Sequence, residues 1–98
     1  MTDLKDRTAL VTGSTSGIGK ATAIALAARG AHVLVVGRNE ERAEQVVAEI
    51  EGNGGRASFR LTTLSDLESA QDLVEWATEA GDGHVDILVN NAGVADSQ

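Results

Sequence analysis

The sequence of 98 residues contains no cysteine, no proline and no tyrosine, and it has one tryptophan and one phenylalanine. Without cysteine, a disulfide scaffold, a thiolate zinc site and a thiol nucleophile are all excluded. Without tyrosine, any mechanism in which a phenol of this sequence donates a proton is excluded. The length allows one small domain.

Long apolar runs are also absent. The longest, Ala23–Ala28, is far shorter than the roughly 20 residues that a helix needs to cross a bilayer. The N-terminal segment reaches a turn signal at Gly13 without the apolar core of a secretory signal. We therefore expect a cytoplasmic protein without a membrane partner.

Charge is distributed unevenly along the chain, whose net charge is −7. Residues 1–39 contain five basic and two acidic side chains, whereas residues 40–98 contain three basic and thirteen acidic ones. The acidic second part argues against nucleic acid as the main partner. The basic first part can still hold a small anion.

Glycines separate short apolar runs from longer amphipathic segments. The runs predict strands at Thr8–Thr12, His32–Val36, Ala57–Leu61 and Val85–Val89. The longer segments predict helices over Ile18–Arg29, from the N-cap Asn39 through Ile50, and from Leu67 through Ala77 after a capping box of Ser65 and Glu68. Strands that alternate with helices predict an α/β fold, a Rossmann-like doubly wound parallel sheet with the third strand near an edge.

For three residues with ring side chains we expect structural rather than functional roles. Trp76 borders the apolar face of the third predicted helix, so we expect it in or beside the core. His32 and His84 have no histidine, cysteine or acid at metal-ligand spacing. We expect neither histidine to have a functional role, and we expect no metal site.

The clearest chemical signal is a glycine-rich turn, Gly13–Gly19, which directly follows the first predicted strand and opens a helix. The N-terminus of a helix offers free N–H groups and a partial positive charge, which suits a phosphate or pyrophosphate. Glycines let the backbone turn tightly and let the ligand approach closely.

Three classes of protein are alternative interpretations of this turn. A phosphate-binding ATPase loop needs four residues before its Gly-Lys and then a hydroxyl, but here five residues separate Gly13 from Gly19-Lys20 and Ala21 follows. A response-regulator-like domain would have clustered acids after the first strand. A dinucleotide-binding fold accepts the strand–turn–helix arrangement.

Together, Thr12-Gly13-x3-Gly17-Ile18-Gly19 and Asn90-Asn91-Ala92-Gly93 resemble the two nucleotide-site motifs of the short-chain dehydrogenase/reductase family. The resemblance covers the whole chain but only the N-terminal part of a family member. It implies that residues 1–98 are an incomplete N-terminal part of one NAD(P)-binding Rossmann domain. It also implies that the complete protein is an oxidoreductase that transfers hydride between nicotinamide and a carbonyl or alcohol.

The resemblance also implies which residues of this chain contact the cofactor. The residues are Gly13, Ser14, Ser16, Gly17, Ile18, Gly19, Arg38, Thr63, Leu64, Asn90, Ala92 and Gly93. An acid after the second strand would select NAD, but Gly37 and Arg38 stand there. The resemblance therefore favours NADP, with NAD as the alternative.

Two positions depart from the family pattern. Ser16 stands where many NADP-preferring members have a basic residue, and Thr63 stands where an aspartate usually binds adenine. The catalytic tyrosine and lysine, the catalytic serine and the asparagine of the proton relay all come later in the family than Gly93. We therefore expect this chain alone to be inactive, and the complete protein to be a dimer or tetramer. A non-catalytic dinucleotide-binding or interaction module is the alternative.

Overall fold

In the described part of the chain, four strands alternate with three helices. The computed structural model describes residues 3–13, 17–61, 67–81 and 83–90. The elements are β1 (Thr8–Thr12), α1 (Gly17–Ala28), β2 (His32–Gly37), α2 (Glu40–Gly52), β3 (Arg56–Leu61), α3 (Leu67–Ala80) and β4 (Ile87–Asn90). The predicted alternation of strands and helices is confirmed.

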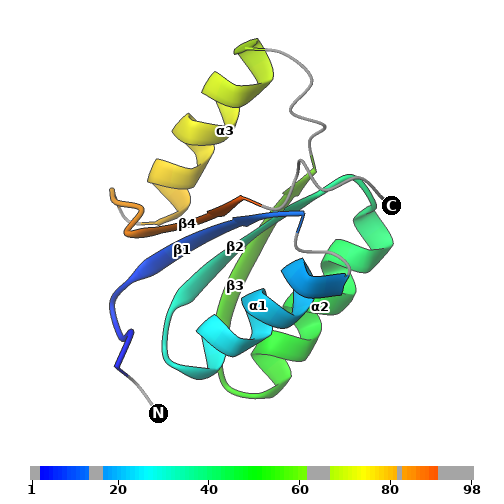
Figure 1. Cartoon of the computed structure of the whole chain (residues 1–98), viewed down its shortest axis with the longest axis vertical. Coiled ribbons are helices and arrows are strands. Elements are labelled where there is room, and N and C mark those ends of the chain that lie inside the picture. Colours follow the sequence, from blue (N-terminus) through cyan, green and yellow to red (C-terminus); the bar gives the residue numbers. More distant parts are fainter. Residues whose placement is uncertain (1–2, 14–16, 62–66, 82, 91–98) are drawn as a thin grey trace.

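The strands form one parallel sheet in the order β3-β2-β1-β4. Helices α1 and α2 cover one face of the sheet and α3 lies on the other (Figure 1). Thr12 of β1 is in register with Val36 of β2 and with Asn90 of β4, so three strands end at one edge. The predicted Rossmann-like α/β class and the edge position of β3 are both confirmed.

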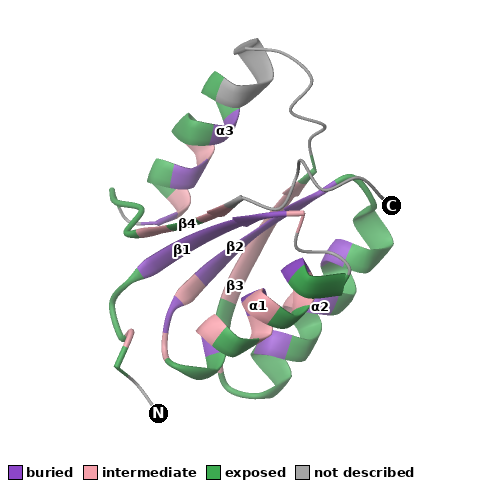
Figure 2. Ribbon diagram, in the orientation of Figure 1, coloured by how far each residue is buried: buried purple, intermediate pink, exposed green. Residues whose placement is uncertain are grey.

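Alternate residues of the central strands supply two separate cores. Val11 and Val35 belong to the core under α1 and α2, together with Ile50 of α2. Leu10 and Leu34 belong to the core under α3, against which Trp76 packs while partly buried. Every residue of β1 is buried (Figure 2), which explains why β1 and β2 are apolar on both faces.

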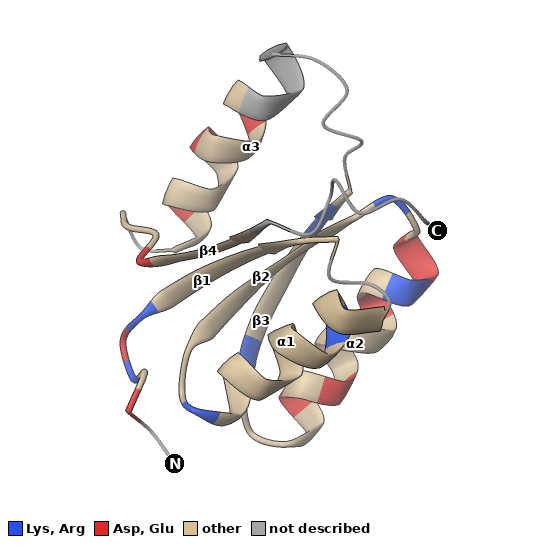
Figure 3. Cartoon of the chain, viewed as in Figure 1, with Lys and Arg blue, Asp and Glu red and all other residues tan. Residues whose placement is uncertain are grey.

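Charged side chains at the surface are concentrated on the helices. Acidic side chains dominate α2 and α3 (Figure 3). Glu40 and Glu41 lie in the first turn of α2, where the helix dipole favours negative charge. The Oδ1 atom of Asn39 accepts the Arg42 N–H at 2.9 Å, so Asn39 is the N-cap that the sequence predicts. The predicted capping box of Ser65 and Glu68 falls outside the described side chains.

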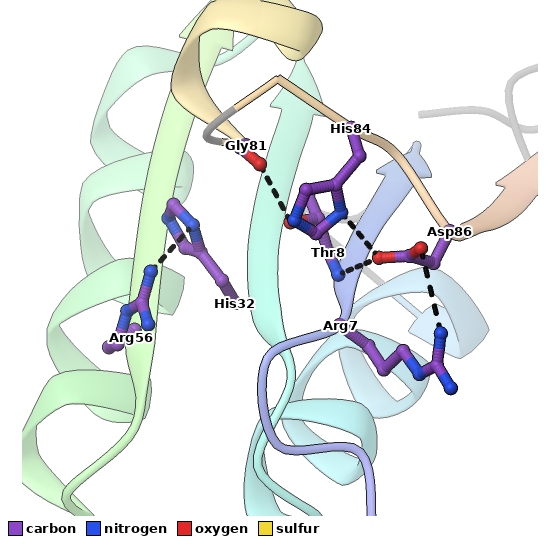
Figure 4. A network of polar contacts seen from close by, with 7 residues as sticks. All are labelled: Arg7, Thr8, His32, Arg56, Gly81, His84 and Asp86. Atoms are coloured by element: carbon purple, nitrogen blue, oxygen red, sulfur yellow. Dashed lines mark hydrogen bonds and ion pairs between the residues drawn. The ribbon is translucent and has the colours of Figure 1, made fainter.

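Strand β4 begins at Ile87, two residues later than predicted. The Asp86 N–H donates to the Thr8 carbonyl at 2.8 Å, and the Thr8 N–H donates to Asp86 Oδ2, also at 2.8 Å. His84 Nδ1 lies 2.7 Å from the same carboxylate oxygen, and Arg7 lies 3.8 Å from the other one (Figure 4). The carboxylate of Asp86 therefore accepts the Thr8 N–H, which a carbonyl of the neighbouring strand would otherwise accept. The β1–β4 ladder consequently begins at the residue after Asp86.

We predict that Asp86→Asn removes an acid-sensitive part of the stability. The Thr8 N–H, and then His84 and Arg7, hold the pKa of Asp86 below its ordinary value of 3.8, against partial burial, which raises it. A carboxylate whose pKa is lower in the folded than in the unfolded protein stabilises the fold at pH values above its unfolded-state pKa. This stabilisation is lost as the pH falls through the folded-state pKa. In urea unfolding, the stability difference between wild type and variant should be full at neutral pH and shrink below about pH 4. A difference that does not vary with pH would contradict the role of the charge.

We predict that Gly81→Ala destabilises the protein, because a Cβ atom there would lie 2.4 Å from the His84 carbonyl oxygen and 2.7 Å from the Thr8 methyl group. Overpacking of this kind costs about 1–3 kcal/mol. Gly52→Ala is the matched control, since an added Cβ there meets nothing within 4 Å. Thermal unfolding should show a lower Tm for the first variant and an unchanged or higher Tm for the control.

Candidate functional site

The candidate site lies where β1 and β4 end side by side. From β1 the chain crosses to α1 and α2 on one face, whereas β4 is reached through α3 on the opposite face (Figure 1). The connection that leaves β1 and the connection that leads into β4 therefore run on opposite faces of the sheet. Open α/β sheets bind ligands outside the carboxyl ends of their strands at such a reversal.

Two glycines of the turn after β1 have a backbone conformation that other residues rarely adopt. The φ angles are 67° at Gly13 and 59° at Gly17, in the left-handed region that favours glycine. Gly17 is also the first residue of α1, and a Cβ atom added there would meet nothing within 4 Å. The missing side chain at Gly17 thus leaves open space at the N-terminus of α1.

Helix α1 presents a row of small residues to the sheet. Gly19, Ala23 and Ala27 are its buried residues and follow one another at intervals of four. Small side chains at this spacing lie on one helical face and let the helix axis approach the strands closely. The N–H groups of the first turn, which have no partner within a helix, therefore lie near the end of β1. The side chain of Ile18 beside them is 79% exposed.

Thr12 connects the two strands at the site itself. Its side chain is buried, and its Oγ1 atom donates to the Val89 carbonyl oxygen at 3.4 Å. Asn90 is the next residue of β4 and pairs with Thr12 in the ladder. The backbone of the second predicted motif therefore begins directly beside the strand that carries the first motif.

Arg38 follows β2 directly and lies at the same edge of the sheet as Gly13. It is exposed. Within residues 3–13, 17–61, 67–81 and 83–90 no acid pairs with it. In contrast, Lys20 of α1 lies 3.8 Å from Glu49 of α2. Of these two cations, Arg38 is the one without a partner acid in the described part of the chain.

The structure thus brings five of the predicted site residues, and the backbone of a sixth, to one edge. Gly13, Gly17, Ile18, Gly19 and Arg38 belong to the ends of β1 and β2 or the start of α1, and Asn90 ends β4. Ser14, Ser16, Thr63, Leu64, Ala92 and Gly93 lie outside the described residues.

Among the described residues, no helix has both the length and the apolar character that spanning a bilayer requires. In the same part of the chain, no three His, Cys, Asp or Glu side chains lie close enough together to hold a metal ion.

The comparisons with known proteins agree with this geometry. The family model described as short chain dehydrogenase matches residues 7–98. A fatty acyl-CoA reductase of Acinetobacter baylyi is 45% identical over 93% of this chain and 30% of its own length. A 7alpha-hydroxysteroid dehydrogenase of Clostridium sardiniense is 45% identical over 95% of this chain and 35% of its own length.

Among solved structures, a short chain dehydrogenase from Burkholderia cenocepacia in complex with NADP is 43% identical, with a TM-score of 0.86 over 97% of this chain and 39% of that one. The chain belongs to the short chain dehydrogenase family. It spans about a third of the length of the curated relatives it matches. The family assignment that the two motifs predicted is therefore confirmed.

One polar cluster was missed by the sequence reasoning. His84 bonds to Asp86, and His32 bonds to Arg56 and contacts Ser58. The His84–Asp86 pair was detectable in the sequence as two residues two positions apart, but that spacing is not a metal-ligand signal. The contacts of His32 depend on the pairing of β2 with β3 and have no local sequence signal.

We predict that Gly17→Ala lowers stability by about 1–2 kcal/mol, because alanine has to adopt a left-handed conformation. Gly52→Ala separates this cost from steric effects, since both positions are open and only Gly17 has a positive φ. The variant should also bind a dinucleotide more weakly than wild type, because its methyl group enters the space beside the turn. Urea unfolding and fluorescence titration measure the two effects, and equal stability of the two variants would contradict the conformational argument.

Proposed function

We propose that this chain forms the nucleotide-binding part of an NADP-dependent oxidoreductase of the short chain dehydrogenase family. The observation that carries the proposal is the strand–glycine turn–helix unit at Gly13–Gly19 beside the end of β4, at the reversal of the crossovers. The Burkholderia relative that contains NADP shares the fold over nearly the whole chain. The proposed reaction is hydride transfer between the cofactor and a carbonyl or alcohol.

The residues present suit a dinucleotide. The pyrophosphate would lie at the N-terminus of α1, where backbone N–H groups and the helix dipole favour an anion. The absence of a side chain at Gly17 keeps that approach open. When bound, the nicotinamide supplies the hydride chemistry. We infer that Ser14, Ser16, Thr63, Leu64, Ala92 and Gly93 complete the site around the ribose and the adenine.

Arg38 supports the preference for NADP. A guanidinium forms two parallel bonds with a phosphate, and Arg38 has no partner acid within the described part of the chain. Gly37 leaves no carboxylate at the end of β2 that would repel a 2′-phosphate. The proposal therefore gives Arg38 the recognition of the 2′-phosphate.

We predict that Arg38→Asp weakens NADPH binding by about 10–100-fold, the value expected for losing a hydrogen bond between charged groups. NADH binding should stay within a few-fold of wild type, because NADH has no 2′-phosphate. Fluorescence titration with each cofactor gives the ratio of the two affinities. Lys5→Asp makes the same change in charge before β1, at the opposite edge, and should leave the ratio unchanged.

The outcomes separate the two parts of the proposal. An unchanged affinity ratio in Arg38→Asp contradicts the role of Arg38 but not dinucleotide binding. If wild-type protein binds neither cofactor, the proposal of a dinucleotide site is wrong.

In the short chain dehydrogenase family a tyrosine donates the proton, and this sequence has no tyrosine. The same absence favours a second candidate function, a non-catalytic dinucleotide-binding module. A Tyr-x3-Lys motif downstream of Asn91 in the coding sequence, together with carbonyl-dependent oxidation of NADPH, would support the enzyme. NADPH binding without either feature would support the module. We further propose a cytoplasmic location and a homo-oligomer for the complete protein.

A further inference from the structure

The positive charge of Arg42 lies in an electrostatically unfavourable place. Arg42 is the third residue of α2, and its N–H donates to the side chain of the N-cap Asn39. The helix dipole disfavours a cation in the first turn of a helix. Arg38 stands four positions earlier and adds a second positive charge beside the same turn.

The acids nearest to Arg42 in the sequence do not offset its charge. Glu40 and Glu41 are two and one positions away, and residues at these spacings do not face each other on a helix. The positions three and four residues away carry no acid, since they hold Arg38, Asn39, Gln45 and Val46. In the part of the chain that the structure describes, no acid forms an ion pair with Arg42. Arg42 is also exposed, so an anion from solution can reach it.

Arg42 lies on the side of α2 that faces α1. Both helices connect parallel strands, and Figure 1 shows them side by side on one face of the sheet, running in the same direction. Glu49 of α2 faces α1, because its carboxylate lies 3.8 Å from the Lys20 ammonium group. Arg42 is seven residues before Glu49, and two turns of a helix return to almost the same side. Arg42 and Glu49 therefore share the side toward α1.

The same ion pair indicates the position of Arg42 along α1. Arg42 is about 10 Å nearer than Glu49 to the N-terminal end of α2. Lys20 is only about 4.5 Å along the helix axis from Gly17, the first residue of α1. Arg42 therefore lies near the N-terminus of α1, at the edge of the sheet that also carries Arg38.

We propose that Arg42 is a second specificity-determining residue for the 2′-phosphate of NADP, acting together with Arg38. This inference rests on the proposed function. A phosphate monoester carries close to two negative charges at neutral pH, which match the two guanidinium groups. Each guanidinium can donate charge-assisted hydrogen bonds to the phosphate oxygens. The bound phosphate would also offset the repulsion between the two arginines.

Arg42→Gln tests this role. The substitution removes the charge but keeps the backbone N–H that Asn39 accepts, and glutamine is favourable at this helix position. We expect the NADPH affinity to fall about tenfold, the lower end of the range for a hydrogen bond to a charged group, because Arg42 is exposed. The NADH affinity should stay as in wild type, because NADH has no 2′-phosphate. Fluorescence titration measures both affinities.

Two smaller ligands separate the 2′-phosphate from the rest of the cofactor. Adenosine 2′,5′-bisphosphate and AMP both lack nicotinamide and differ only in the 2′-phosphate. Calorimetric titration of Arg42→Gln should show weaker binding of the bisphosphate and unchanged binding of AMP. An equal loss for both ligands would contradict the proposed contact.

Two further variants are controls. Lys5→Gln removes the same charge from an exposed position before β1, at the opposite edge of the sheet, and should leave every affinity unchanged. Arg42→Lys keeps the charge without the planar guanidinium, so it should lose less NADPH affinity than Arg42→Gln. A urea unfolding curve like that of wild type shows that each variant is folded.

The outcomes distinguish this inference from the proposed function. If wild type binds NADPH and Arg42→Gln weakens NADPH and NADH equally, Arg42 acts on a part common to both cofactors and the inference is wrong. An unchanged NADPH affinity in Arg42→Gln also overturns the inference but leaves dinucleotide binding intact. Binding of neither cofactor by wild type contradicts the proposed function, and the inference with it.

Discussion

The pairing of β1 with β4 is the contact on which the site depends. It joins segments more than 70 residues apart, and side-chain bonds hold it at both ends of β1. Thr8 donates from Oγ1 to the Gly81 carbonyl and from its N–H to Asp86, while Thr12 donates to the Val89 carbonyl. Without this pairing, Asn90 would not lie level with Thr12, and the two motifs would be separate loops.

Threonine suits these two positions for a physical reason. β1 is buried along its whole length, and a buried hydroxyl is costly unless it has a hydrogen-bond partner. Threonine combines the β-branched shape that strands favour with a hydroxyl that finds a carbonyl on the β4 side. The strand therefore stays packed on both faces while its two ends are fixed against β4.

The fold could be predicted in some detail because its signals are local. Continuous apolar runs at Thr8–Thr12 and His32–Val36 identify buried parallel strands, and Asn39 followed by two glutamates identifies a helix start. The start of β4 was predicted two residues early, because a side chain rather than a strand carbonyl accepts the Thr8 N–H. That bond joins residues 78 positions apart, so no local pattern indicates it.

The candidate site was predictable only in part, for the same reason. The glycines with positive φ and the exposed arginine after β2 can be recognised in the sequence, because each feature depends on one residue and its neighbours. Of the cluster around His32 and His84, only the short spacing of His84 and Asp86 is visible in the sequence, because the rest forms only when β3, β2, β1 and β4 align at their amino ends. The register of the sheet, rather than any motif, creates that cluster.

The two edges of the sheet are chemically unequal, and this difference follows from the parallel arrangement itself. At the carboxyl edge, helix N-termini supply positive potential from the backbone, and glycine leaves room for an anion to approach them. At the amino edge the helix dipoles have the opposite sign, and arginines and histidines gather there instead. Backbone recognition at the first edge is sensitive to any added side chain, as the open space at Gly17 indicates.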